Sequence, residues 1–150
     1  MTGNAGRATD ADPFKLERFV AAQNDSGTFD QAMKELQSGR KTSHWMWFVF
    51  PQVAGLGHSS LSRTYAISGP DEAKAYLAHP VLGARLRQSA EVVLAISGRT
   101  AEQVFGGVDA QKLRSSMTLF LRAAPDDDLF HRVLDRFFDG VADTATDRLL

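Results

Sequence analysis

The side chains best suited to chemistry gather in one stretch of the chain, from Lys41 to Ser59. This stretch holds both tryptophans and two of the four histidines. Histidine acts as a base or hydrogen-bond partner near neutral pH, and an indole ring stacks on planar or cationic groups. We therefore expect the functional site where this aromatic stretch meets the surface.

Two histidines are the catalytic candidates, His44 and His58. His44 falls at a predicted helix start, where unpaired backbone N–H groups disfavour the imidazolium and leave a neutral ring usable as a base. The alternative for His44 is a structural bond to a backbone carbonyl. His58 follows the glycine-containing turn 55–57, which is expected to lie at a chain reversal.

We predict an aromatic-lined pocket for a phosphorylated or nucleotide-like small molecule, an ADP-ribose derivative among the options. Either Arg63 or Arg85 would hold the anion. The predicted ligand-binding residues are Lys41, His44, Trp45, Trp47, Gln52, His58, Ser59, Arg63 and Tyr65. Hydrolysis of an N-glycosidic bond would also need a group that positions water, and the nearest carboxylate candidate is Glu72, which is equally a capping residue at a helix start.

A second interpretation makes the aromatic stretch part of the core. The protein is then a non-enzymatic interaction or regulatory module whose basic middle region binds an acidic protein partner. Residues 39–122 carry ten basic and five acidic side chains, although the net charge of the whole chain is −1. A serine-lysine pair, Lys112 with Ser115 or Ser116, is a weaker option, because serines on an apolar helix stripe more often bond backward to the previous turn.

Composition excludes several classes of site. The net charge of −1 and the pI near 6.4 argue against general nucleic-acid binding, which depends on many phosphate contacts. The chain lacks cysteine, and no histidine pair has the i, i+4 spacing of a zinc motif, so we expect neither a metal nor another cofactor. The sequence shows no apolar segment of membrane-spanning length and no hydrophobic signal segment, which favours a cytoplasmic location.

The elements that must position these residues are helices. Helical periodicity predicts one all-α domain over residues 12–150, a multihelical array of about eight or nine short helices, after a disordered lead over residues 1–11. Residues 45–50 suit a buried strand or helix; we favour a short helix capped by Ser43 and stopped before Pro51.

Helix termini are predicted from capping residues and proline. We expect a helix from Asp12, capping boxes at Thr28 and Thr100, and a cap at Asp109. Pro80 is expected to open the longest helix, and Asp143 is expected to cap the last one.

Several motifs resemble those of the bacterial DUF-1810 family, sometimes mislabelled calpastatin. They are Arg40-Lys41, His44-Trp45-Met46-Trp47-Phe48, Phe50-Pro51-Gln52, Gly55-Leu56-Gly57, Glu72-Ala73, Tyr76-Leu77, His79-Pro80-Val81-Leu82-Gly83, Phe105-Gly106, Lys112 and Ser115-Ser116-Met117-Thr118-Leu119-Phe120. The resemblance implies an all-helical single domain without a known activity, so it supplies no catalytic residues. A looser analogy, in size and aromatic-plus-polar composition, links the chain to NADAR-type domains, which are associated with ADP-ribose derivatives.

Overall fold

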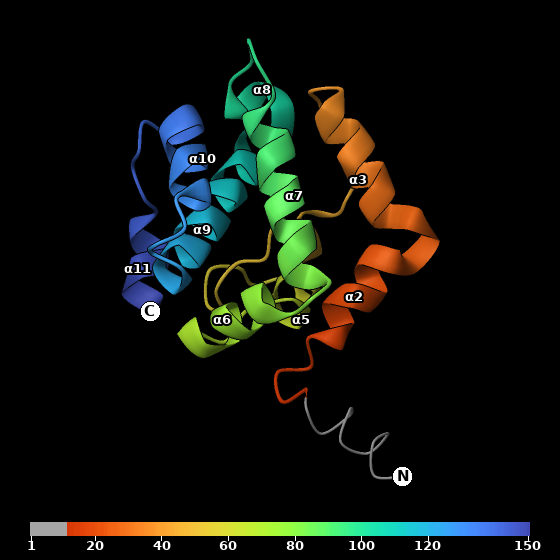
Figure 1. The fold of residues 1–150 in the computed structure, drawn as a ribbon, viewed down its shortest axis with the longest axis vertical. Helices are drawn as coiled ribbons and strands as arrows, with labels where there is room; N and C mark the ends of the chain where they lie inside the picture. Colours follow the sequence, from red (N-terminus) through yellow and green to blue (C-terminus); the bar gives the residue numbers. More distant parts are fainter. Residues whose placement is uncertain (1–11) are drawn as a thin grey trace.

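The structure is a computed structural model that describes residues 12–150; the predicted disordered lead lies outside the described residues (Figure 1). Within that range the chain is helical, which confirms the all-α prediction. The helices are α2 (Glu17–Asn24), η1 (Asp25–Gly27), α3 (Thr28–Gln37), α4 (Met46–Val49), α5 (Ser60–Thr64), α6 (Pro70–Ala78), α7 (Leu82–Leu94), α8 (Ala101–Phe105), α9 (Gly107–Ala123), α10 (Leu129–Phe138) and α11 (Thr144–Leu149).

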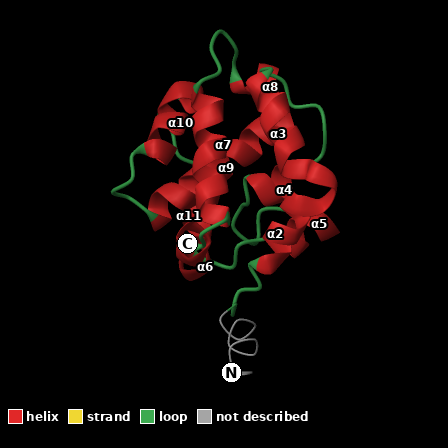
Figure 2. Cartoon of the chain, turned by 45° about the vertical axis from the view of Figure 1, so that its right-hand side comes forward, coloured by secondary structure: helices red, strands yellow, loops and turns green. Residues whose placement is uncertain are grey.

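Helix α9 lies at the centre of the array and contacts α6, α8, α10 and α11. Its buried face includes Leu113, Met117 and Phe120, which recur at helical spacing. Helix α7 packs against α3, α6 and α10, and both long helices run through the middle of the molecule (Figure 2). None of the helices of residues 12–150 combines the length and the apolar character needed to cross a membrane.

Helices α2 and α3 form the predicted helical hairpin, but its caps differ from expectation. The predicted start at Asp12 is wrong, because α2 begins at Glu17 with Leu16 at its N-cap position; the side chain of Asp12 accepts hydrogen bonds from the backbone N–H groups of Leu16 and Glu17. The capping box at Thr28 is wrong. Gly27, in the left-handed conformation with φ +67°, precedes α3, and the Thr28 hydroxyl donates to a backbone carbonyl instead.

Helix α4 supports the choice of a short helix for the aromatic stretch. Phe50 leaves the helical region with φ −125° and ψ 74°, directly before Pro51, as predicted. The cap was predicted wrongly: the helix begins at Met46, and the Ser43 hydroxyl donates to Glu35 and accepts no hydrogen bond from the N–H groups of the helix. The charged carboxylate of the buried Glu35 is a strong hydrogen-bond acceptor, which explains why the Ser43 hydroxyl turns toward it.

Later helix termini show a mixed outcome. The capping box of Thr100 with Gln103 and the cap by Asp143 are confirmed. Helix α9 starts at Gly107, so Asp109 lies in its first turn and is not its cap. With 17 residues, α9 is longer than α7 with 13, which corrects the prediction that the helix after Pro80 is the longest.

Candidate functional site

A pocket of about 280 Å³ lies between the end of α4 and helix α5. Four of its lining side chains have chemistry that suits a ligand: Trp47, Gln52, Arg63 and Tyr65. The backbone of residues 53–57 supplies much of the remaining wall. The pocket therefore forms where the aromatic stretch leaves the core.

The floor of the pocket is held by a short parallel pairing between Val53 and Ile67. The Ile67 N–H donates to the Gln52 carbonyl, and the Ala54 N–H donates to the Ile67 carbonyl, both at 2.8 Å. Val53 and Ile67 are buried in the hydrophobic core. Because both segments are anchored on their apolar side, Gln52 and Ala54 have fixed positions at the pocket.

Two glycines shape the loop that closes the pocket. Gly55 has φ +103°, and a Cβ atom there would come within 3.2 Å of the Leu149 side chain from α11. A Cβ at Gly57 would meet the Ser62 hydroxyl at 2.6 Å. The Ser59 side chain accepts a bond from the Ser62 N–H and so caps α5. The glycines thus serve a tight turn and close packing.

The aromatic wall consists of two partly exposed rings, Trp47 and Tyr65. The Tyr65 ring is supported from behind by Phe48 and Phe19, with ring centroids 5.4 and 5.7 Å away. Among residues 12–150, neither the Tyr65 hydroxyl nor the Gln52 side-chain amide has a hydrogen-bond partner. Polar groups that meet no protein partner are available to water or to a ligand.

A lysine pair lies beside the two tryptophans. The Nζ atom of Lys112 is 4.7 Å from the centre of the Trp47 ring, and that of Lys41 is 5.0 Å from the Trp45 ring. Both ammonium groups share one carboxylate, Asp109, at 2.8 Å for Lys41 and 3.4 Å for Lys112. Two cations with one anion leave an excess positive charge next to Trp47.

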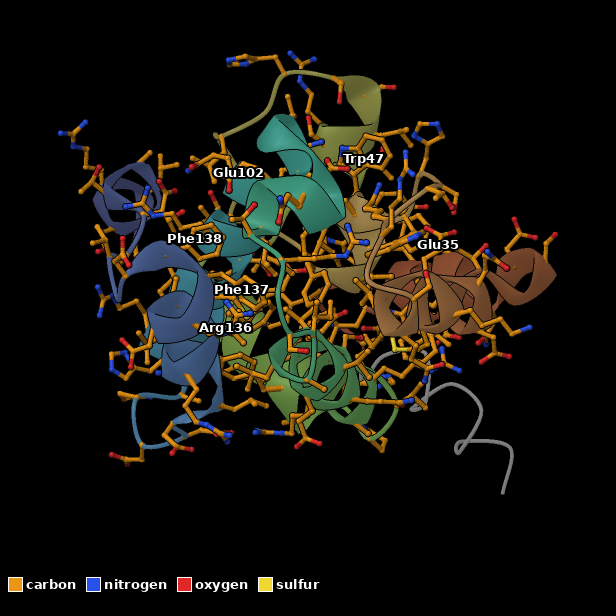
Figure 3. The ribbon with its side chains drawn as sticks, turned by 90° about the horizontal axis from the view of Figure 1, so that it is seen from above. Glu35, Trp47, Glu102, Arg136, Phe137 and Phe138 are labelled. Carbon is orange, nitrogen blue, oxygen red and sulfur yellow. The ribbon has the colours of Figure 1, made fainter. Side chains whose placement is uncertain are left out.

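The loop before the tryptophans is organised by Glu35 of α3, labelled with Trp47 in Figure 3. The Glu35 carboxylate accepts hydrogen bonds from the backbone of Thr42 and Ser43, the Ser43 hydroxyl, the Trp45 indole and the Gln31 amide. Burial would raise the pKa of Glu35, but these bonds outweigh it and lower the pKa from 4.5 to about 2.

The comparisons with known proteins agree with this fold. The family model described as a protein of unknown function, DUF1810, matches residues 13–150. The chain belongs to the DUF1810 family. A crystal structure of the conserved hypothetical protein Rv1873 from Mycobacterium tuberculosis is similar to it, with 47% sequence identity, a TM-score of 0.90, and coverage of 93% of this chain and 98% of that one. No curated protein matches the chain.

In this DUF1810 chain, four of the nine predicted ligand-binding residues line one pocket: Trp47, Gln52, Arg63 and Tyr65. The structure places the others elsewhere. Trp45 is fully buried in the core, and Lys41 is buried beside it. His44 is exposed on a separate hollow near the start of α3, while His58 and Ser59 are exposed in the loop that follows the pocket wall.

The other acid, base and cation candidates have structural partners. Glu72 is buried, forms an ion pair with Arg18 at 2.9 Å and accepts a bond from the Ser68 N–H. Arg85 donates to Gln23 and lies over the Phe29 ring. No group of three or more His, Asp or Glu side chains in the described range is arranged to hold a metal ion.

The serine-lysine arrangement does not assemble. Ser115 donates a hydrogen bond to Asp143 at 2.9 Å. The Ser116 hydroxyl is buried without a hydrogen-bond partner in residues 12–150, and Lys112 pairs with Asp109 instead. A nucleophilic serine needs its base within hydrogen-bond reach, which these contacts do not provide.

Sequence reasoning missed Glu35 and assigned Asp109 only as a helix cap, whereas both carboxylates fix the loop of this DUF1810 protein. Glu35 interrupts the apolar face of its helix, between Met33 and Leu36, and a charged residue at a buried position requires partners. That pattern was a usable signal. The pairing of Asp109 with Lys112 is also visible as an i, i+3 spacing, whereas its bond to Lys41 joins distant parts of the chain.

Proposed function

We propose that this protein binds a small, planar, negatively charged molecule in the pocket of Trp47, Gln52, Arg63 and Tyr65, and that it does so in the cytoplasm. The two rings offer faces for stacking. The Gln52 amide offers a donor and an acceptor for the polar edge of a ring, and the Arg63 guanidinium matches a phosphate or carboxylate.

The observation that carries the proposal is the set of unpartnered polar groups at the pocket. Gln52 and Tyr65 are half-buried, yet the amide and the hydroxyl bond to no residue in the range 12–150. By contrast, the amide of the buried Gln23 is bonded to Phe48, Tyr76 and Arg85. A polar group left without a partner in a concave, aromatic-lined place is a typical feature of a ligand site.

The size of the pocket limits the ligand. At about 280 Å³ it lies at the small end of the range for small-molecule sites. One heterocyclic ring fits this volume, with an attached phosphate near the exposed Arg63. Of a molecule such as ADP-ribose, only one part would be enclosed, and the rest would extend over the surface.

The lining favours binding over catalysis. No histidine, lysine, aspartate or glutamate is among the described residues that line the pocket. General acid-base catalysis most often uses such a side chain within hydrogen-bond reach of the reacting atom, and the ionisable side chains of this lining are those of Arg63 and Tyr65. We therefore propose recognition as the function of this pocket, without hydrolysis.

Calorimetric titration with AMP, ADP-ribose and uncharged adenosine tests the proposal. We expect AMP and ADP-ribose to bind more tightly than adenosine, with a change in Trp47 fluorescence. Arg63→Ala should remove the advantage of the charged compounds, because their phosphate loses its cation. Arg132→Ala is the matched control, since Arg132 is also exposed and forms no ion pair in the described chain.

Two results would contradict the proposal. One is the absence of saturable binding for all three compounds at millimolar concentrations. The other is an equal loss of affinity in Arg63→Ala and Arg132→Ala, which would indicate general charge attraction. Trp47→Phe keeps a ring at the site, so it should abolish the fluorescence change while calorimetry still detects binding.

A further inference from the structure

A second hollow, of about 450 Å³, lies at the end of α3 and shares no lining residue with the aromatic pocket. Three of its lining side chains are cationic: Lys34, Arg40 and Arg99. Ser38 and Thr42 add hydroxyl groups to the same surface. Residues from α3, from the loop that follows it and from the loop after α7 therefore meet here.

The three cations are not neutralised by the described part of the chain. No ion pair of residues 12–150 involves Lys34, Arg40 or Arg99. The one carboxylate in the lining, Glu35, is already bonded to five donors, four of them from the loop that carries the tryptophans. The lining thus has three positive charges, and its one negative charge, on Glu35, already accepts hydrogen bonds from other residues.

The carbonyl groups at the end of α3 do not bind these cationic side chains either. Basic side chains often bond the last free carbonyls of a helix. Here the carbonyls are taken: Lys34 O accepts from the Ser38 N–H, Glu35 O accepts from the Arg40 N–H, and Leu36 O accepts from the Gly39 N–H. The ammonium and guanidinium groups therefore keep their donors free.

A glycine allows Arg99 to approach the hollow. Gly39 has φ +80°, and a Cβ atom at this position would come within 3.3 Å of the Arg99 Nε atom. The Arg99 side chain therefore lies close over the turn that follows α3. On the other side of this segment, the guanidinium of Arg136, which lies on α10, donates to the backbone carbonyls of Ile96 and Arg99. The Arg99 segment is thus held from both sides.

We propose that this hollow binds a phosphate-type oxyanion that carries two or more negative charges. Guanidinium groups bind phosphate oxygens in pairs, and the lysine adds a point charge. The Thr42 hydroxyl lies in the same lining and can donate to an oxygen of the anion, whereas the Ser38 hydroxyl already donates to the Glu35 carbonyl at 2.8 Å. The proposal is independent of the aromatic pocket, because the two sites have no lining residue in common.

The test is a ¹⁵N NMR and calorimetric titration with inorganic pyrophosphate at constant ionic strength. We expect saturable shifts of the Gly39 and Thr42 amide signals. Arg40→Gln and Arg99→Gln should each weaken binding by about tenfold, the usual effect of a lost charge-assisted contact. The matched control Arg132→Gln should leave the affinity for pyrophosphate unchanged.

Several outcomes would overturn the proposal. These are shifts that rise linearly without saturation, shifts that map outside the hollow, or equal losses in Arg99→Gln and Arg132→Gln. If Arg99→Gln fails to fold, Arg99→Lys, which keeps the positive charge, is titrated in its place. In a second arm, the monoester AMP is compared with inorganic phosphate: equal shifts at Gly39 and Thr42 identify a site for the terminal phosphate of a larger molecule, and shifts by the inorganic ions alone identify a site for free anions.

Discussion

The two tryptophans stand two residues apart and have opposite environments. Trp45 is fully buried, and its indole N–H donates to Glu35 at 2.9 Å. Trp47 is half-buried, lines the pocket, and its indole N–H meets no acceptor within residues 12–150. Each ring nevertheless has a lysine over one face, and both lysines bind the same aspartate.

The comparison shows that the cation over the ring does not decide what each tryptophan does. The difference lies in the acceptor for the N–H group. A bonded, buried indole fixes the fold, whereas an indole with an open edge at a pocket is available to a ligand. The following experiments separate these two roles.

The largest effect is expected at Glu35, because its loss leaves five donors without their acceptor. Glu35→Ala should lower the free energy of unfolding by about 3–5 kcal/mol. The measurement is urea unfolding followed by circular dichroism. Glu102→Ala is the control: Glu102 is exposed on α8 (Figure 3), and its loss should change stability by about 0.5 kcal/mol or less. Similar losses of unfolding free energy in both variants would show that Glu35 does not organise the loop.

Acid should lower the free energy of unfolding, because it protonates the Glu35 carboxylate that binds the Trp45 indole. The pKa of Glu35 is lowered by folding from 4.5 to about 2, so its contribution is complete above about pH 5 and is lost as the pH falls toward 2. The shift corresponds to about 3 kcal/mol. Urea unfolding between pH 6 and pH 2 measures it. Glu35→Gln should show a flatter pH dependence; an unchanged slope would refute the assignment.

Replacing each tryptophan by phenylalanine should separate the structural role of the buried Trp45 from the pocket-lining role of Trp47. Trp45→Phe loses a buried hydrogen bond and leaves a cavity, so we expect a loss of about 2 kcal/mol in unfolding free energy. Trp47→Phe should cost less than about 1 kcal/mol, because the ring is partly exposed. Thermal and urea unfolding of the two variants give the difference, and equal losses would show that both rings are structural.

The last prediction concerns the affinity of the pocket rather than the stability of the fold. Trp47→Ala should weaken binding of AMP by about tenfold, since stacking of a base on an aromatic side chain contributes about 1–3 kcal/mol. Titration calorimetry measures this. The control is Phe137→Ala on α10, a partly buried ring outside the pocket lining that should leave AMP affinity unchanged. A Trp47→Ala protein that is folded and binds AMP normally would show that the indole is not the stacking surface.

Much of the fold was predictable because helical periodicity and helix caps depend on residues that are close in the sequence. The capping box at Thr100 and the cap at Asp143 follow from short spacings. One error arose where a distant partner competed. Ser43 was predicted to cap α4, but it bonds to Glu35 of α3. Single-sequence reasoning has no access to such pairings between remote segments.

The pocket was predictable in part. Trp47, Gln52, Arg63 and Tyr65 were identified from residue type alone, and the structure brings them together. His44 was grouped with them because it is near in sequence. It lies before a helix of only four residues, so the chain turns between His44 and the pocket, and the histidine reaches a different surface. Proximity in sequence is a weak guide where the backbone reverses within a few residues.

The contact between Gly55 and Leu149 has a consequence for biosynthesis. The loop that bounds the pocket packs against α11, which follows α9 and α10 in the chain, so the ribosome has made both of those helices before this support exists. Long-range contacts of this kind form late, because a large loop must close first. A nascent chain is therefore expected to build its core around α9 first, and the pocket takes its final shape only after α11 has docked.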